Sequence, residues 1–65
     1  MNNGSVLWFN RTKGYGFIKE KDTEEHFFVH HRDIKDFKFL KKDDEVFFDI
    51  ANGEKGKKAI NVRKN

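Results

Sequence analysis

Tyr15-Gly16-Phe17-Ile18-Lys19 is the stretch that decides the fold. Side chains alternate between the two faces of a strand, so Tyr15 and Phe17 share one face and Ile18 lies on the other. This period of two, in place of the helical 3.6, predicts a β-strand. The strand would carry two aromatic rings on one side and an aliphatic side chain on the other.

Four further runs of the same kind surround this strand, at residues 6–10, 27–30, 46–50 and 59–62. Turn-forming segments separate them at 10–14, 21–25 and 41–45. Asn52-Gly53 predicts a hairpin, with residues 54–58 lengthening its loop, and the irregular segment 34–40 has room for one helical turn. Five short strands in 65 residues predict an all-β protein, closed into a barrel because closure removes unprotected strand edges.

Length and composition narrow the class of protein further. At 65 residues we expect one small domain, spanning 1–65, with a thin core. Aromatic residues make up 15% of the chain, which argues against disorder even though 38% of residues are charged. The chain has no cysteine, no apolar run of the ~20 residues that span a bilayer, and no export signal at its start. These features predict a cytoplasmic protein that does not enter membranes.

Alternation along the five runs assigns side chains to the two faces of the sheet. The predicted core comprises Val6, Ile18, Phe27, Val29, Val46, Phe48, Ile50, Ile60 and Val62, with Ile34 and Leu40 closing the ends. The rings left outside or at the rim are Trp8, Tyr15, Phe17, Phe28 and Phe37. Trp8 shares the parity of Val6, so its exposure requires a bulge or a strong bend in the first strand.

Charge is distributed unevenly along the chain. Residues 1–19 and 55–65 contain only basic charges, whereas 20–54 contain six basic and eleven acidic residues. If the two ends lie side by side, they form one basic face that suits a polyanion, although a solvated surface of mixed charge is the simpler interpretation.

Outward rings interleaved with lysines fit one chemistry well. Bases of a single strand stack on aromatic faces while ammonium groups follow the phosphates. Gly14 and Gly16 flank Tyr15 and leave room for close approach beside its ring. The competing interpretation is that these rings are simply core.

The motifs resemble those of bacterial cold-shock proteins. Lys13-Gly14-Tyr15-Gly16-Phe17-Ile18 is similar to the first ribonucleoprotein motif of that family, and Phe27-Phe28-Val29-His30 is similar to the second. Matching segments also occur at 8–10, 36–38 and 59–62, so the resemblance covers essentially the whole chain. It implies a five-stranded antiparallel OB-fold barrel that binds single-stranded RNA and DNA and acts as an RNA chaperone.

The resemblance also implies roles for individual residues. The positions that match the family's binding site are Trp8, Phe9, Lys13, Tyr15, Phe17, Phe28, His30, His31, Phe37 and Lys55. Phe27 matches an apolar position that faces the core, and Phe9 a ring that is partly buried. No cofactor, metal or catalytic residue is expected, and the chain should be a monomer, with a strand-swapped dimer as the other possibility.

Three positions depart from the family pattern. His31 replaces a common aromatic residue, so one stacking subsite is expected to be weaker and sensitive to pH. Leu7 replaces a common lysine, and Lys57 a common proline.

The sequence also admits two other interpretations. A zinc site is disfavoured because the chain has no cysteine and the neighbouring His30 and His31 are expected to point apart on a strand. A small β-barrel that binds a peptide or protein through its aromatic patch remains the alternative function.

Overall fold

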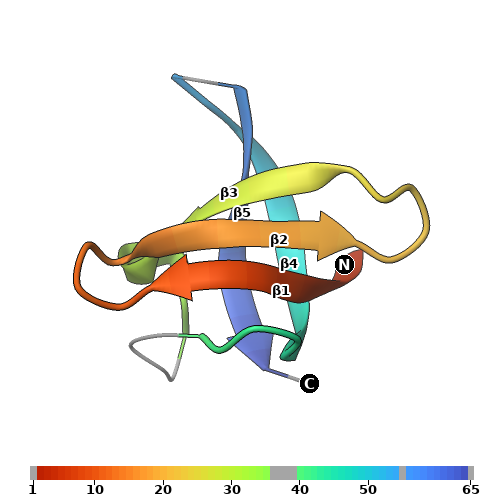
Figure 1. The fold of residues 1–65 in the computed structure, drawn as a ribbon. Helices are drawn as coiled ribbons and strands as arrows, with labels where there is room; N and C mark the ends of the chain where they lie inside the picture. The colour runs from red at the N-terminus through yellow and green to blue at the C-terminus, as the bar shows by residue number, and fades with distance from the viewer. Residues whose placement is uncertain (1, 36–39, 55, 65) are drawn as a thin grey trace.

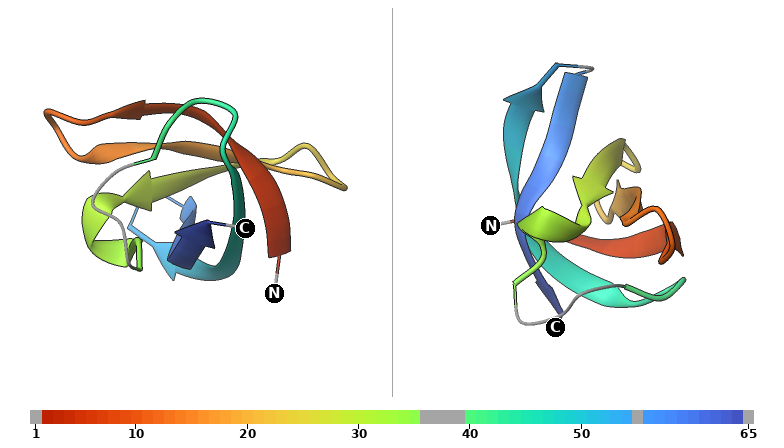
Figure 2. Two further views of the ribbon diagram at one scale, coloured as in Figure 1. Left: turned by 90° about the horizontal axis from the view of Figure 1, so that it is seen from below. Right: turned by 90° about the vertical axis from the view of Figure 1, so that its left-hand side faces the viewer.

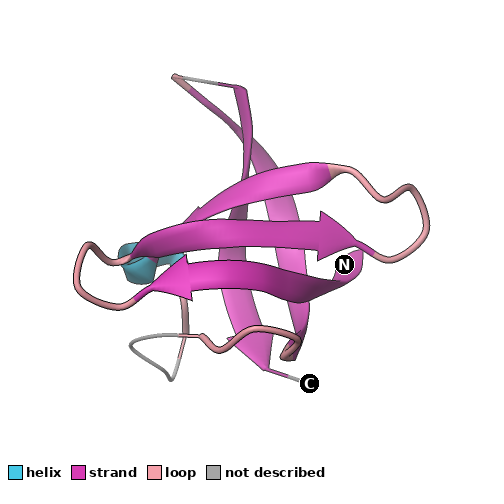
Figure 3. Ribbon diagram, in the orientation of Figure 1, coloured by secondary structure: helices cyan, strands magenta, loops and turns pink. Residues whose placement is uncertain are grey.

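The computed structural model describes residues 2–35, 40–54 and 56–64. Five strands follow one another along the chain (Figures 1 and 3): β1 (Asn2–Asn10), β2 (Tyr15–Glu20), β3 (His26–His30), β4 (Glu45–Gly53) and β5 (Gly56–Lys64). A 3-10 turn, η1 (His31–Asp33), follows β3. The strands close into a barrel in the order β1-β2-β3-β5-β4, which confirms the predicted all-β barrel.

One of the five strand pairings is parallel. Strands β1–β2, β1–β4, β2–β3 and β4–β5 pair antiparallel, whereas β3 and β5 meet in parallel through Phe28 and Lys58. Strand directions cannot alternate all the way round a closed ring with an odd number of members, so one neighbouring pair has to be parallel. The expected antiparallel barrel is therefore antiparallel at four of its five seams.

The core lies inside this ring and matches most of the predicted inward set. The buried hydrophobic residues are Val6, Ile18, Phe27, Val29, Ile34, Leu40, Val46, Phe48, Ala59 and Val62. Phe27 is in the core, as the alternation predicts, and Ile34 and Leu40 are buried as well. Figure 2 shows how the strands curl around this interior when the barrel is seen from below and from the side.

Two residues of the predicted core were placed wrongly. Ile50 is 37% exposed and Ile60 is only half-buried, whereas Ala59 is fully buried. For Ile60 the cause is an irregularity in the β4–β5 ladder, where the two steps from Phe47 to Asp49 in β4 match the three steps from Arg63 to Ile60 in β5. Asn61 has a positive φ of 51° at this point. The extra residue shifts the alternation, so Ala59 and Val62 both face inward.

The bulge predicted in the first strand is present. Val6 pairs with Ile18, but the next pair is Trp8 with Phe17, so Leu7 is the extra residue of β1. This insertion reverses the parity after Val6 and turns Trp8 outward. Trp8 is 44% exposed.

The predicted hairpin joins β4 to β5, but its loop and the placement of the basic segments differ from expectation. Strand β4 continues to Gly53 and β5 begins at Gly56, so Asn52-Gly53 belongs to a strand and the loop is shorter than predicted. Figure 1 shows this end of β4 and β5 projecting beyond the other strands. The 3-10 turn lies at His31–Asp33. Most of the segment 34–40, which has room for one helical turn, lies outside the described residues. Strand β3 separates β2 from β5, so the two basic segments flank β3 rather than touch.

In the part of the chain that the structure describes, no helix is long and apolar enough to cross a membrane.

Candidate nucleic-acid interface

Four aromatic rings from three adjacent strands gather on one outer face of the barrel. Trp8 extends from β1, Tyr15 and Phe17 from β2, and Phe28 from β3. The ladder places Trp8 opposite Phe17 and Phe17 opposite Phe28. Cross-strand partners share a face of the sheet, so the register alone brings three of these rings together. We call Trp8, Tyr15, Phe17 and Phe28 the aromatic surface.

The rings of the aromatic surface touch one another in a closed circuit. The centroids of Trp8 and Phe17 are 5.5 Å apart, and those of Phe17 and Phe28 are 5.8 Å apart. Tyr15 lies 5.8 Å from Phe28, with the planes inclined by only 30°, and 5.8 Å from Trp8. These separations are typical of favourable aromatic pairs. The rings therefore support each other at the surface without entering the core.

Phe9 and Gly16 form the margin of this surface. Phe9 is partly buried and packs against the core, as the resemblance implied. Gly16 lies where β1 and β2 approach closely, since a Cβ there would be 2.2 Å from the carbonyl oxygen of Trp8. A side chain at residue 16 would push apart the strands that carry Trp8 and Phe17.

His30 and His31 lie at the end of β3 and, contrary to expectation, their rings are close. Their centroids are 4.4 Å apart because His31 starts the η1 turn and no longer follows the strand. The backbone N–H of His31 donates to the carbonyl oxygen of Gly14 at 2.8 Å. The His31 ring also fills the space that a Cβ on Gly14 would need, and Gly14 has a positive φ of 76°. No group of three metal-ligating side chains occurs among residues 2–35, 40–54 and 56–64.

Arg32, which follows the two histidines, holds the His30 ring in place. Its Nδ1 accepts hydrogen bonds from the backbone N–H of Arg32 at 3.2 Å and from Arg32 Nε at 3.3 Å. Desolvation is the largest cause that lowers the pKa of His30, and the positive charges of His31, Arg32 and Lys58 lower it further. The Asp33 carboxylate opposes this shift. With Nδ1 acting as acceptor, the proton of the neutral ring is on Nε2, which is then a donor.

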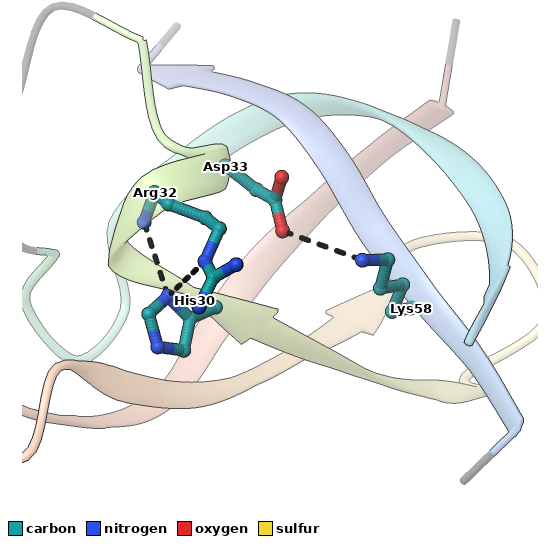
Figure 4. A network of polar contacts seen from close by, with 4 residues as sticks. All are labelled: His30, Arg32, Asp33 and Lys58. Carbon is teal, nitrogen blue, oxygen red and sulfur yellow. Dashed lines mark hydrogen bonds and ion pairs between the residues drawn. The ribbon is translucent and has the colours of Figure 1, made fainter. Parts of the chain in front are cut away.

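A hollow of about 730 Å³ extends the face beyond Phe28. It lies between β3, η1 and the projecting end of the β4–β5 pair. Its lining includes Phe28, His30, Arg32, Asp33 and Lys58. The Lys58 ammonium lies 3.9 Å from Asp33 Oδ2, across the seam between η1 and β5 (Figure 4).

Sequence reasoning did not find all of these residues. It treated Lys58 as one lysine among several and passed over Arg32 and Asp33. The available signal was the pair of charged residues Arg32 and Asp33, which follows His31 just after the second motif, where the strand pattern ends.

Of the other residues predicted from the sequence, one lies in a described turn and two lie outside the described residues. Lys13 lies exposed in the turn between β1 and β2, where its backbone N–H donates to Asn10 Oδ1 at 2.9 Å. Phe37 and Lys55 lie outside the described residues, so their predicted roles stay predictions. The structure therefore brings four of the predicted rings into the aromatic surface. Phe9 of β1 lies at one edge of it. His30, the last residue of β3, and His31, the first of η1, lie at another.

The sequence profile of the 'Cold-shock' DNA-binding domain family matches residues 2–65. The chain belongs to the cold-shock domain family. A cold shock-like protein of Aquifex aeolicus (strain VF5) is 48% identical over 92% of this chain and 89% of its own length. One from Escherichia coli (strain K12) is 49% identical over 91% and 87%, and one from Bacillus cereus is 46% identical over the whole of both chains.

This membership agrees with the geometry of the face. Cold-shock domains are nucleic-acid-binding modules and are not typically enzymes. In this cold-shock domain the two ribonucleoprotein-like motifs lie on β2 and β3, the neighbouring strands that supply three of the four rings of the aromatic surface.

Proposed function

We propose that residues 1–65 act as one cold-shock domain that binds single-stranded RNA and DNA, and that they work as an RNA chaperone in the cytoplasm. Bases stack on the aromatic surface while basic side chains contact the phosphates. The observation that carries this proposal is the closed circuit of Trp8, Tyr15, Phe17 and Phe28 at the surface. A monomer normally avoids such an exposed apolar patch unless it binds something.

The chemistry of stacking accounts for a broad range of targets. Each base has a π-face, and stacking on an aromatic side chain contributes about 1–3 kcal/mol per base with little regard to sequence. Bases inside a duplex are already stacked on their neighbours, so the aromatic surface would select unpaired strands. A protein that holds unpaired strands opposes RNA secondary structure, which is the chaperone activity we propose.

The remaining sequence-predicted residues take supporting parts in this proposal. Lys13, beside the β1–β2 turn, and Lys55 would contact phosphates, and Phe37 would add a ring. His30 would donate from Nε2 to a base or phosphate, and His31 would supply a smaller stacking surface. One chain carries the whole site, so we propose that the monomer is the binding form.

Trp8 provides the test, because it is the only tryptophan of the chain and is 44% exposed. The protein is titrated with oligo-dT and oligo-U of about eight nucleotides, a length within the range one OB barrel covers, and Trp8 emission is followed. Quenching by single strands, and none by a duplex of equal length, is the expected result. No quenching at tens of micromolar strand would overturn the proposal.

Salt separates this function from the alternative of a peptide-binding barrel. Contact with about three phosphates predicts a slope near −2 in a plot of log affinity against log salt concentration. An apolar groove for a peptide should be much less sensitive to salt. A flat plot would make the protein-interaction module the better explanation of the aromatic surface.

A further inference from the structure

The hollow next to Phe28 contains a charge arrangement that stacking does not explain. Lys58 of β5 is the register partner of Phe28 across the parallel seam. Partners in register leave the sheet on the same face, so the lysine stem extends beside the Phe28 ring. A base stacked on Phe28 would bring its phosphate close to the Lys58 ammonium.

Two further basic side chains, Arg32 and Lys57, line the same hollow as Lys58. Arg32 lies in the same hollow, with its Nε bonded to His30 Nδ1. The pKa of His30 is lowered first by desolvation and then by the charges of His31, Arg32 and Lys58, so the surroundings disfavour a further cation. The positive charges of Arg32 and Lys58 would attract an anion to this point, whereas desolvation favours no ion of either sign.

Glu25, Asp33 and Glu54 also line the hollow, and Asp33 is the acidic residue that pairs with Lys58. The Asp33 carboxylate is poorly satisfied. Asp33 Oδ2 is buried and has no hydrogen-bond partner among the described residues. Its distance of 3.9 Å to Lys58 Nζ is that of an ion pair, and it is too long for a hydrogen bond. Figure 4 shows the carboxylate directed at the ammonium from the far side of the seam.

The Asp33–Lys58 ion pair is a weak one. The Lys58 side chain is 37% exposed and that of Asp33 is 19% exposed, so water and salt screen their attraction. Lys58 can therefore turn from the carboxylate to a phosphate. Asp33 cannot follow, because it is anchored in the η1 turn, and its negative charge then repels the incoming phosphate.

Resting on the proposed function, we infer that Lys58 forms a phosphate subsite beside Phe28 and that Asp33 attenuates it by competing for the same ammonium. The ligand is the phosphodiester of a single strand whose base stacks on Phe28. Asp33 is a positioning residue that touches no ligand and acts through Lys58. Because of this carboxylate, a strand binds less tightly at this end of the face than it would to the aromatic surface and Lys58 without Asp33.

The test compares four proteins: the unchanged chain, Lys58→Gln, Asp33→Asn and the double variant. Their affinity for oligo-dT of about eight nucleotides is measured through Trp8 emission at several salt concentrations. Lys58→Gln should weaken binding and make the salt slope shallower by about 0.7, the contribution of one phosphate contact on a single strand. Asp33→Asn should tighten binding by about twofold to fivefold, the range of a partly exposed charge interaction.

The double variant decides whether Asp33 acts through Lys58. If it does, Asp33→Asn has little effect once Lys58 is glutamine. An equal gain in both backgrounds would overturn the attenuation, because Asp33 would then act only as a general negative charge. Weaker binding by Asp33→Asn alone would overturn it as well.

Lys42→Gln is the matched control, since it removes one charge from an exposed residue outside the hollow. An equal change of salt slope in Lys42→Gln and Lys58→Gln would overturn the subsite. Lys58→Arg keeps the charge and should keep the slope, which guards against misfolding of the glutamine variant. If the unchanged chain fails to bind oligo-dT at all, the proposed function fails; if it binds and the variants match it, only this inference fails.

Discussion

Phe28 and Val29 are neighbours in β3 that point to opposite faces of the same sheet. Phe28 belongs to the aromatic surface, whereas Val29 is fully buried in the core. We predict that Phe28→Ala or Phe17→Ala weakens oligo-dT binding by roughly 1–3 kcal/mol and leaves the thermal midpoint almost unchanged. Val29→Ala should instead lower the free energy of unfolding by roughly 1–2 kcal/mol, because it leaves a cavity.

The two measurements are Trp8 titration for binding and far-UV circular dichroism melting for stability. Val29→Ala is the control for Phe28→Ala, since it alters the adjacent residue on the other face. Loss of folded structure in Phe28→Ala would place its ring in the core, and an unchanged midpoint in Val29→Ala would contradict the assignment of faces.

The environment of His30 leads to a prediction about how the stability of the protein depends on pH. Its pKa in the folded protein is lowered from the ordinary value of 6.5, chiefly by desolvation. As the pH falls through 6.5 the unfolded chain takes up this proton first, so the free energy of unfolding decreases. Protonation also removes the Nδ1 acceptor that bonds Arg32. The contribution of His30 is complete above pH 6.5 and declines toward its lower folded pKa.

His30→Gln isolates this contribution, because glutamine keeps an acceptor but does not titrate. Thermal midpoints of the two proteins are compared between pH 7.5 and 5.5, and the two proteins differ only at residue 30. The unchanged chain should lose more stability than His30→Gln as the pH falls. Parallel curves of thermal midpoint against pH would show that His30 does not contribute to the pH dependence of stability.

Among the elements, β1 and β5 show what the sequence can and cannot predict. The β1 bulge was predictable, because Trp8 and Val6 share parity and only an inserted residue resolves the conflict. The β5 bulge was missed, since strict alternation through Ile60 and Val62 looked consistent. The overlooked signal was Asn61, a residue type that tolerates positive φ better than most and does so here at 51°.

One part of the candidate site was predictable from the sequence and the other part was not. Trp8, Tyr15, Phe17 and Phe28 come together as expected, because strand register is local and period-two alternation fixes their face. The hollow was not predictable in this way. It depends on the parallel seam that places Lys58 beside Phe28 and on a turn that brings Asp33 to that seam. Both are long-range outcomes of closing the ring.

The close approach of β1 and β2 gives a prediction for the elements themselves. A Cβ on Gly16 would lie 2.2 Å from the carbonyl oxygen of Trp8 and 2.7 Å from the Cα of Phe9. Both obstructing atoms are backbone, so Gly16→Ala has to move a strand. We predict a loss of roughly 1–3 kcal/mol in the free energy of unfolding, which unfolds much of so small a domain.

Gly53→Ala is the matched control for Gly16→Ala. It adds the same methyl group to another strand, where the nearest backbone atom is the carbonyl oxygen of Gly56 at 3.1 Å. Urea titration of both variants should show the larger loss for Gly16→Ala. Equal losses would show that the β1–β2 approach is not specially tight in solution.

For the whole molecule, the proposed function and the small core imply that a bound strand adds much to the free energy of unfolding. A ligand that binds only the folded state adds about 2.7 kcal/mol at a concentration one hundred times its dissociation constant. In a domain of 60–100 residues each kcal/mol moves the thermal midpoint by about 4–8 °C. We therefore predict that saturating oligo-dT raises the midpoint by roughly 10–20 °C, measured by far-UV circular dichroism. A duplex of equal length should raise it far less, and Phe28→Ala should reduce the shift in proportion to the binding free energy it loses. An equal shift with duplex would mean that the basic side chains, and not the aromatic surface, provide the binding energy.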